Sequence, residues 1–319
     1  MSAILISVSV LMQAGCFGYL SGRLTPSGSL LLSCAGFFMS ALLFTAVHLV
    51  RRGRRRPEVV LPGPVERRRT NRLMWLMNLV TATTFLSFYV SLAWIPATLA
   101  SGIETAVGPL ALVVLALVFR AGERPTPLVW GTAVALAAAG GALAWSLTGG
   151  ADIGWEALAG LGLVTVAGVG ASGLALVSKK LGGLGTHPVT VTAHRFHLTY
   201  LGAGVLFLLQ GGSPHDSGVP LVLIPLLGIV AITIPLFILQ IGLQRAHPMA
   251  AMTILTTLPG MTYLSETLWG GSVDIASLAL TGLLVVLAAV SATPRQSGER
   301  ATSRPSERSL ASVGNKDNS

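Results

Sequence analysis

The fold is decided by residues 220–243, which read PLVLIPLLGIVAITIPLFILQIGL and contain no charged side chain. About 20 consecutive, mostly apolar residues are enough for a helix to cross the hydrocarbon core of a bilayer. Similar runs recur along the chain as far as about residue 292. The ten expected spans are 3–21, 27–50, 73–93, 96–119, 127–147, 156–178, 189–210, 220–243, 248–268 and 275–292.

The composition agrees with a membrane environment. The 319-residue chain is 52% hydrophobic and only 10% charged, whereas about a quarter of the residues in a soluble domain are charged. Only helices and closed barrels satisfy their backbone hydrogen bonds inside lipid. The runs are too continuously apolar, and too rich in Leu, Ala and Gly, for the alternating strands of a barrel. The sequence therefore predicts an all-α membrane protein with the lipid bilayer as its surroundings.

The basic residues predict the orientation. The net charge is +9, and nine arginines lie in the loop 51–72 between two apolar runs. With a cytoplasmic N-terminus, 19 of the 21 Lys and Arg residues face the cytoplasm, Arg23 faces outside and Arg195 lies within a span. This asymmetry is typical of cytoplasmic loops, and it predicts that both termini are cytoplasmic in the cell membrane. No aromatic residues are interleaved with the basic ones, so we expect no nucleic-acid partner.

Neither the cysteines nor the ends of the chain change this interpretation. Cys16 and Cys34 lie within apolar runs and are expected to be packing residues without a disulfide framework. The N-terminus is expected to be the first spanning helix and not a removed signal. Residues 293–319 are rich in Ser, Arg, Glu and Pro, and they predict a disordered cytoplasmic tail.

The chain contains a weak internal repeat. Three pairs of residues recur with offsets of 152, 150 and 151 positions: Pro96 and Pro248, Pro109 and Pro259, Gly131 and Gly282. Each copy would hold five spans, and an odd number forces the second copy to enter the membrane from the opposite side. We therefore predict a 5+5 inverted repeat, a common plan of secondary transporters. The first copy would be 1–147, including the arginine-rich loop, and the second 148–292.

A family resemblance lies in residues 91–110, SLAWIPATLASGIETAVGPL, and in residues 120–126, RAGERPT. These stretches resemble the EamA-type transporters of the drug/metabolite transporter superfamily. The acidic Glu104, five residues before Pro109, is similar to the branch that exports threonine and homoserine. The resemblance implies ten helices and a transport function. The chain departs from the pattern in its second copy, where Gly271-Ser272 stands in place of a Gly-Glu pair and Glu266 lies in the preceding helix.

Glu104 is the first candidate for a substrate or proton site. It lies eight residues into its span, about 12 Å along the helix. A charged side chain inside a membrane costs about 2.5–3.5 kcal/mol on insertion scales, unless it faces water or a partner. Glu104 could couple transport to protons or bind a substrate amine. The alternative is a structural hydrogen bond to a neighbouring Ser or Thr.

Arg195 could bind a substrate carboxylate through two parallel hydrogen bonds. It also lies near the predicted cytoplasmic end of its span, so it could instead extend its head group to the interface. His194 and His197 are three residues apart and would share a helix face. His197 is a candidate for the substrate or proton site. No Cys or carboxylate lies nearby in sequence, so we expect no metal and no cofactor.

The remaining candidates are polar or helix-breaking residues within spans. Glu266, beside Tyr263 and Trp269, could belong to the site or to an interfacial aromatic belt. Pro109 and Pro259 occupy corresponding helices and could shape or gate a central site. Three further residues could line the cavity or form interhelical hydrogen bonds: Asn78, Tyr89 and Gln240.

These features favour a secondary active transporter, driven by protons, that exports amino acids or related small metabolites. An intramembrane enzyme is not expected, because the sequence contains no metal-protease His-Glu-x-x-His, no Gly-x-Ser-x-Gly elbow and no P-loop. A non-transporting membrane sensor or scaffold stays open as the alternative. Small residues in 137–141 and 168–173 allow close helix packing, within one chain or between the two copies of a homodimer.

Overall fold

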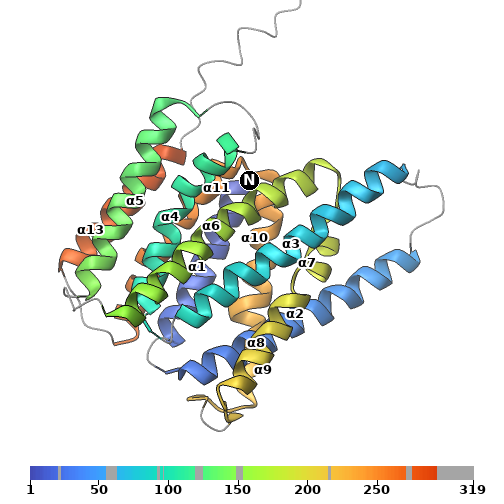
Figure 1. Ribbon diagram of the computed structural model, residues 1–319, viewed down its shortest axis with the longest axis horizontal. Helices are drawn as coiled ribbons and strands as arrows, with labels where there is room; N and C mark the ends of the chain where they lie inside the picture. The colour runs from blue at the N-terminus through green and yellow to red at the C-terminus, as the bar shows by residue number, and fades with distance from the viewer. Residues whose placement is uncertain are drawn as a thin grey trace, which may run out of the picture.

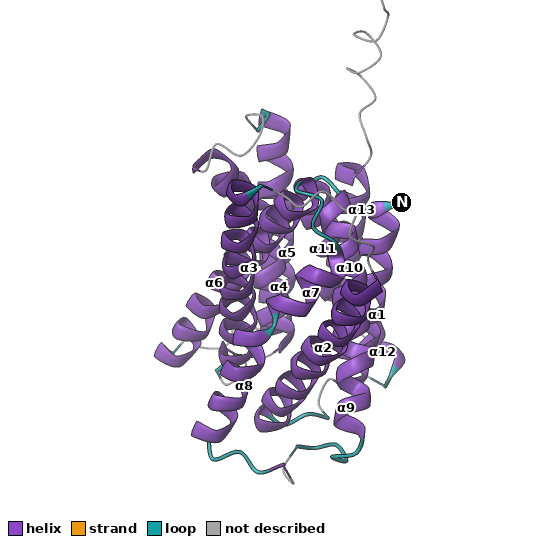
Figure 2. Ribbon diagram, turned by 90° about the vertical axis from the view of Figure 1, so that its right-hand side faces the viewer, coloured by secondary structure: helices purple, strands orange, loops and turns teal. Residues whose placement is uncertain are grey.

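The computed structural model describes residues 1–20, 23–54, 63–91, 94–95, 97–118, 125–148, 154–214, 217–270 and 275–292, and within these ranges the regular structure is helical (Figure 2). The first six helices are α1 (Ser2–Leu20), α2 (Pro26–Arg54), α3 (Pro64–Ser91), α4 (Ala97–Val118), α5 (Pro127–Thr148) and α6 (Trp155–Gly183). The others are α7 (Pro188–Arg195), α8 (His197–Leu209), α9 (Leu223–Gly228), the π-helical turn η2 (Ile229–Thr233), α10 (Ile234–Arg245), α11 (Pro248–Leu255), α12 (Leu258–Leu268) and α13 (Ile275–Ala292).

Length and polarity place this bundle in a membrane. In the described part of the chain, six helical segments are long and apolar enough to cross a bilayer: Ser2–Leu20, Ser27–Gly53, Pro64–Ser91, Ala100–Val118, Trp155–Gly183 and Leu221–Arg245. Large apolar side chains cover the outside, including Leu42 and the 70%-exposed Trp75, while Thr81 and Ser172 are fully buried. Lipid is the solvent that suits such a surface. The prediction of an all-α membrane protein is confirmed at this level.

The other four expected spans correspond to α5, to α7 with α8, to α11 with α12, and to α13. Two of them are interrupted. The span expected over 189–210 is divided at Phe196, and the span expected over 248–268 is divided at Thr256 and Thr257. Since each piece is short, neither pair counts as one long apolar helix. The interruptions lie at residues that the apolar pattern alone does not distinguish.

The helices pack in a definite order (Figure 1). α3 lies along α6, and α4 packs against both α5 and α6. α1 packs against α10 and α12, while α2 contacts α7, α8 and α9. α5 and α13 lie side by side at one edge of the bundle. The largest hydrophobic core joins α1, α2, α10 and α11 around residues such as Ile6, Phe37 and Met252.

One close helix approach depends on glycine. Gly36 of α2 and Gly228 of α9 face each other, and a Cβ atom on Gly228 would lie 2.7 Å from the Cα atom of Gly36. Beside them, the hydroxyls of Ser40 and Thr233 form a hydrogen bond of 2.7 Å. Thr233 belongs to η2, which precedes Pro235. The π-helical turn thus adapts the backbone just before a proline that has no N–H to donate.

The arginine-rich segment is partly helical. α2 continues to Arg54, and α3 begins at Pro64, nine residues before the expected span 73–93. Arg67, Arg68 and Arg69 are exposed on this first part of α3. Both helices therefore extend past their apolar portions at the same end of the bundle (Figure 1). Several predicted features lie outside the described residues: loop residues 55–62, Pro96, the 120–124 motif, Gly271-Ser272 and the tail 293–319.

Candidate functional site

A cavity of about 370 Å³ lies inside the bundle. Most of its wall is apolar, with contributions such as Phe17, Phe88 and Leu239. Its polar lining residues come from six helices and from Thr25, just before α2: Gln13, Thr25, Ser29, Ser33, Thr84, Tyr89, Ser101, Glu104, Thr105, Arg195, Thr262 and Glu266. A concave, mostly apolar space with a few converging polar groups is the usual form of a small-molecule site.

The position of the cavity along the bundle follows from its lining. Leu20 is the last residue of α1, Ser29 lies in the first turn of α2, and Glu266 is close to the end of α12. The cavity extends from this end of the bundle inward to Arg195, Leu243 and Met252. α2 begins beside the cavity at Pro26 and ends at Arg54, so the arginine-rich segment lies at the opposite end.

Glu104 is the acidic group in the middle of the wall. Its helix, α4, is pressed closely against α6, because a Cβ atom on Gly168 would lie 2.6 Å from the backbone oxygen of Glu104. The Tyr89 side chain lies within electrostatic range of Glu104 and beside Ser33. Within the described residues, the Glu104 carboxyl has no hydrogen-bond or ion-pair partner. The expected alternative, a structural hydrogen bond to a neighbouring Ser or Thr, is therefore not formed there.

Arg195 supplies a positive charge at the inner part of the cavity. It is the last residue of α7 and only 2% exposed. One terminal nitrogen, Nη1, donates a hydrogen bond of 2.6 Å to Oε1 of Gln240. The guanidinium carbon lies 4.9 Å from the ring centroid of Phe196. A side chain this deeply enclosed does not reach an interface, so the geometry argues against the snorkelling alternative.

Gln240 lies behind Arg195, not in the cavity wall. It is fully buried on α10, and its Oε1 atom also accepts a hydrogen bond of 3.3 Å from the Ser178 hydroxyl of α6. Gln240 thus ties α6, α7 and α10 together at one point. The sequence analysis named Gln240 as a possible lining residue. Its contact with Arg195 joins two different helices, so the apolar run that contains Gln240 does not predict it.

Asn78 is also placed outside the cavity wall. Its side-chain oxygen accepts a hydrogen bond of 3.1 Å from the backbone N–H of Leu198, at the second residue of α8. The first N–H groups of a helix have no partner within the helix, so Asn78 satisfies one of them. It supports the interruption between α7 and α8, directly after Arg195.

The two prolines have different surroundings. Pro109 is inside the uninterrupted helix α4, whereas Pro259 lies in the first turn of α12. In a first turn the missing proline N–H removes no helical hydrogen bond, so Pro259 suits a helix start. The two corresponding positions therefore differ in local structure: only Pro259 marks an interrupted helix.

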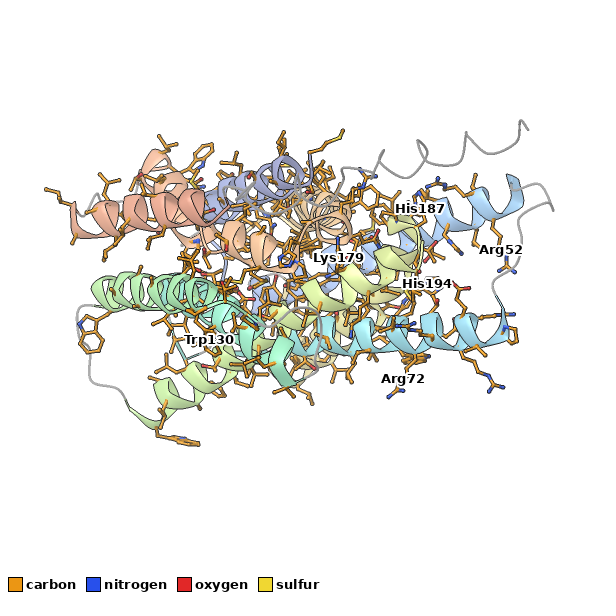
Figure 3. All side chains as sticks on the ribbon, turned by 90° about the horizontal axis from the view of Figure 1, so that it is seen from above. Arg52, Arg72, Trp130, Lys179, His187 and His194 are labelled. Carbon is orange, nitrogen blue, oxygen red and sulfur yellow. The ribbon has the colours of Figure 1, made fainter. Side chains whose placement is uncertain are left out.

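His197 belongs to a row of contacting side-chain rings where α2 packs against α7 and α8. His194 lies 5.6 Å from His48 and 6.3 Å from His197, and His197 lies 5.9 Å from Tyr200, measured between ring centroids. His194 is exposed and stands at the same end of the molecule as Arg52 (Figure 3). The structure does not bring His197 to the cavity. In the described ranges, no group of three or more His, Cys, Asp or Glu side chains could hold a metal ion.

Glu266 lines the cavity near its outer end. The neighbouring Trp269 packs edge-on against Tyr19 with ring centroids 5.0 Å apart, and the guanidinium of Arg23 lies 4.2 Å from the Tyr19 ring centroid. These aromatic and cationic groups join the end of α1 to the end of α12. Both expectations for Glu266 thus have a structural counterpart, because it faces the cavity and lies beside an aromatic cluster.

Gln13, Ser33 and Thr262 are lining residues that the sequence reasoning did not select. Gln13 is the clearest of these omissions, because an amide in the middle of the apolar run 3–21 is a recognisable signal. Its Nε2 atom donates a hydrogen bond of 2.9 Å to the Ser9 hydroxyl, within α1. Ser33 and Thr262 are small polar residues of a kind that is common inside membrane helices. The sequence therefore does not mark them as candidates for a site.

Together the fold and the cavity define a helical membrane protein with an internal site that holds both an acidic and a basic side chain. No protein-family model and no curated protein matches the chain. Thirteen chains of known structure match it. One of them, a crystal structure described only as that of a protein, is 18% identical and has a TM-score of 0.69. The alignment covers 93% of this chain and 98% of that one, so the two proteins share a fold.

Proposed function

We propose that this protein is a secondary active transporter of the EamA type in the drug/metabolite transporter superfamily, and that it exports amino acids or related small metabolites. The observation that carries the proposal is a cavity inside a membrane bundle that has both Glu104 and Arg195 in its wall. A carboxylate and a guanidinium in one cavity match the ammonium and carboxylate groups of an amino acid. The apolar remainder of the wall suits an aliphatic side chain.

The helix packing supports a ten-span 5+5 arrangement. If each span has its counterpart five spans later, α3 corresponds to α10, α6 to α1 and α4 to α12. α3 packs along α6, and their counterparts α10 and α1 also pack together. α4 contacts α5 and α6, and its counterpart α12 contacts α13 and α1. Similar halves of opposite orientation can rock around a central site and expose it to each side in turn.

Glu104 is proposed to couple this movement to protons. An ionised carboxylate in an apolar wall is stabilised by a cation, and either a proton or a substrate ammonium group meets that need. Competition between the two at one side chain links proton entry to substrate release. Tyr89 lines the same cavity within electrostatic range of Glu104, so its hydroxyl dipole would act on either state.

We further propose that the protein resides in the cell membrane with both termini in the cytoplasm. Arg51, Arg52 and Arg67 lie at the end of the bundle opposite the one where Ser29 and Glu266 line the cavity. The excess of basic residues on cytoplasmic loops supports placing that end inside the cell. The cavity would then be open toward the outside, as expected of an exporter after it has moved its substrate across.

Flux measurements in proteoliposomes test the function. Amino-acid uptake or release that follows an imposed proton gradient, and stops when an ionophore removes the gradient, is the expected result. Glu104→Gln should abolish this coupling. Glu66→Gln is the matched control, because Glu66 lies on the exposed start of α3, away from the cavity. Absence of flux across a broad metabolite panel would favour the sensor or scaffold alternative.

A further inference from the structure

We infer that Arg195 and Gln240 form a subsite for the carboxylate group of the transported molecule, in which Gln240 positions the guanidinium without neutralising its charge. This inference rests on the proposed transport function and narrows the substrate class to amino acids and other small carboxylates. Arg195 would contact the substrate directly. Gln240 would act through Arg195, as a positioning residue.

The first argument is the unbalanced charge. Arg195 is 2% exposed, and in the described part of the chain no carboxylate lies within ion-pair distance of it. A buried charge without a counter-ion is strongly unfavourable, and proteins normally pair it or expose it. Among the described residues, the one hydrogen-bond acceptor that meets the guanidinium is the neutral amide of Gln240. A counter-ion supplied by a ligand would complete the site.

The second argument is the direction of the guanidinium. Nη1 is occupied by Gln240, and Nε is enclosed without a partner. Nη2 has no hydrogen bond to a described residue and, unlike Nε, is not fully enclosed, while the residue as a whole lines the cavity. Nη1 is thus held by Gln240, and Nη2 is the nitrogen left to meet a ligand in the cavity that Arg195 lines. Its N–H groups suit the oxygen atoms of a carboxylate.

The third argument is the choice of an amide behind Arg195. Ser178 donates to the same Oε1 atom that accepts from Arg195, so the Gln240 carbonyl is fixed in direction from two sides. Glutamate has nearly the same shape and would make the same contact, but its charge would neutralise Arg195. Glutamine holds the guanidinium in place and keeps its charge for a ligand.

Two sources could supply the anion: a carboxylate on the substrate or a small anion such as chloride. The structure favours the substrate, because Arg195 shares its cavity with Glu104 and with apolar side chains. A cavity of about 370 Å³ has room for a molecule of amino-acid size, and a chloride ion uses neither the acidic group nor the apolar wall.

The test measures ligand-induced thermal stabilisation of the purified full-length protein, so it is independent of transport. Each of the common amino acids is tried, and any that stabilises is compared with its amide, for example L-leucine with L-leucinamide. Sodium chloride alone is a separate arm. We expect stabilisation by an amino acid, and an apparent affinity for its amide that is weaker by about tenfold or more, since a charge-assisted hydrogen bond is lost.

The decisive variant is Gln240→Glu, which changes charge with little change of shape. We expect apparent affinity for the amino acid to fall by about tenfold or more, because Arg195 gains an internal counter-ion. The unfolding midpoint without ligand should stay equal or rise. Gln244→Glu is the matched control: Gln244 is also buried, one turn further along α10, and does not contact Arg195. It should lower the midpoint. Gln240→Met, which removes the acceptor, should weaken affinity without adding charge.

Three results would overturn the inference: equal stabilisation by an amino acid and its amide, stabilisation by sodium chloride to which amino acids add nothing, or an unchanged affinity in Gln240→Glu. Stabilisation by no amino acid would overturn the substrate class. The transport proposal fails separately. If binding discriminates between acid and amide but proteoliposomes show no flux, the subsite stands and the transport function does not.

Discussion

Asn78 on α3 accepts a hydrogen bond of 3.1 Å from the backbone N–H of Leu198 on α8, and this contact holds the interruption that follows Arg195. Arg195 is the last residue of α7 and lines the cavity, so the direction of its side chain depends on where α7 ends. The free N–H at a helix start is usually satisfied by a capping residue next to it in the chain. Here a side chain from a neighbouring helix satisfies it instead.

We expect Asn78→Leu to lower the unfolding midpoint and to reduce substrate flux. The lost cap leaves a part-buried N–H of Leu198 without a partner, which costs about 1–2 kcal/mol. Thermal unfolding in detergent measures the effect. Asn71→Leu is the control, because Asn71 is exposed on the same helix. Equal midpoints for the two variants would show that the Asn78 contact contributes nothing to the fold.

Gly228→Ala should destabilise the bundle. The added methyl group would lie 2.7 Å from the Cα atom of Gly36, a backbone atom that cannot turn aside. Overpacking of this kind costs about 1–3 kcal/mol, so the unfolding midpoint should fall. Gly15→Ala provides the comparison, since a Cβ atom at Gly15 meets nothing within 4 Å. Equal unfolding midpoints for the two variants would contradict the close approach of α2 and α9.

Ser29→Cys, in a background with Cys16 and Cys34 replaced by alanine, should react with a membrane-impermeant thiol reagent added outside intact cells. Ser29 lies in the cavity wall near the end of the bundle that we assign to the outside. Ser178→Cys is the control, because Ser178 is fully buried between α6 and α10. Labelling of Ser29→Cys only after the cells are opened would reverse the proposed orientation.

Pro109→Ala and Pro259→Ala should differ. Alanine at 109 restores a backbone hydrogen bond in the middle of α4, so we expect the unfolding midpoint to rise. Alanine at 259 restores none, because the first turn of α12 has no helical partner for that N–H, and the midpoint should change little. If the missing backbone hydrogen bond at Pro109 is needed for movement, the stabilised variant will transport more slowly. A falling midpoint in Pro109→Ala would show that the proline ring itself is required for packing.

Much of this architecture follows from the sequence because lipid imposes a simple rule on the chain. The apolar runs gave close approximations to the helices, and their intramembrane polar residues led to Glu104, Tyr89, Arg195 and Glu266, which line one cavity. These residues are conspicuous because charge and large polar groups are unfavourable in apolar surroundings.

The interruption at Phe196 and the role of Gln240 could not be predicted in the same way. Phe196 is a large apolar residue in an apolar run, and the break there depends on a contact from α3, more than a hundred residues earlier in the chain. Gln240 is distinguished only by its partner, Arg195, which lies on another helix. Such features are set by three-dimensional contacts, and a single sequence carries no local signal for them.

α5 and α13 contribute no described residue to the cavity wall and pack mainly against each other and against α4, α11 and α12. Mutations on this pair of helices therefore meet lipid, or the backs of other helices, before they meet a molecule in the cavity. Adaptation to a thicker bilayer or a different lipid composition can accumulate there while the cavity wall is preserved. Changes in what the cavity accepts, conversely, can arise on α4, α7 and α10 without altering the surface that the membrane touches at that edge.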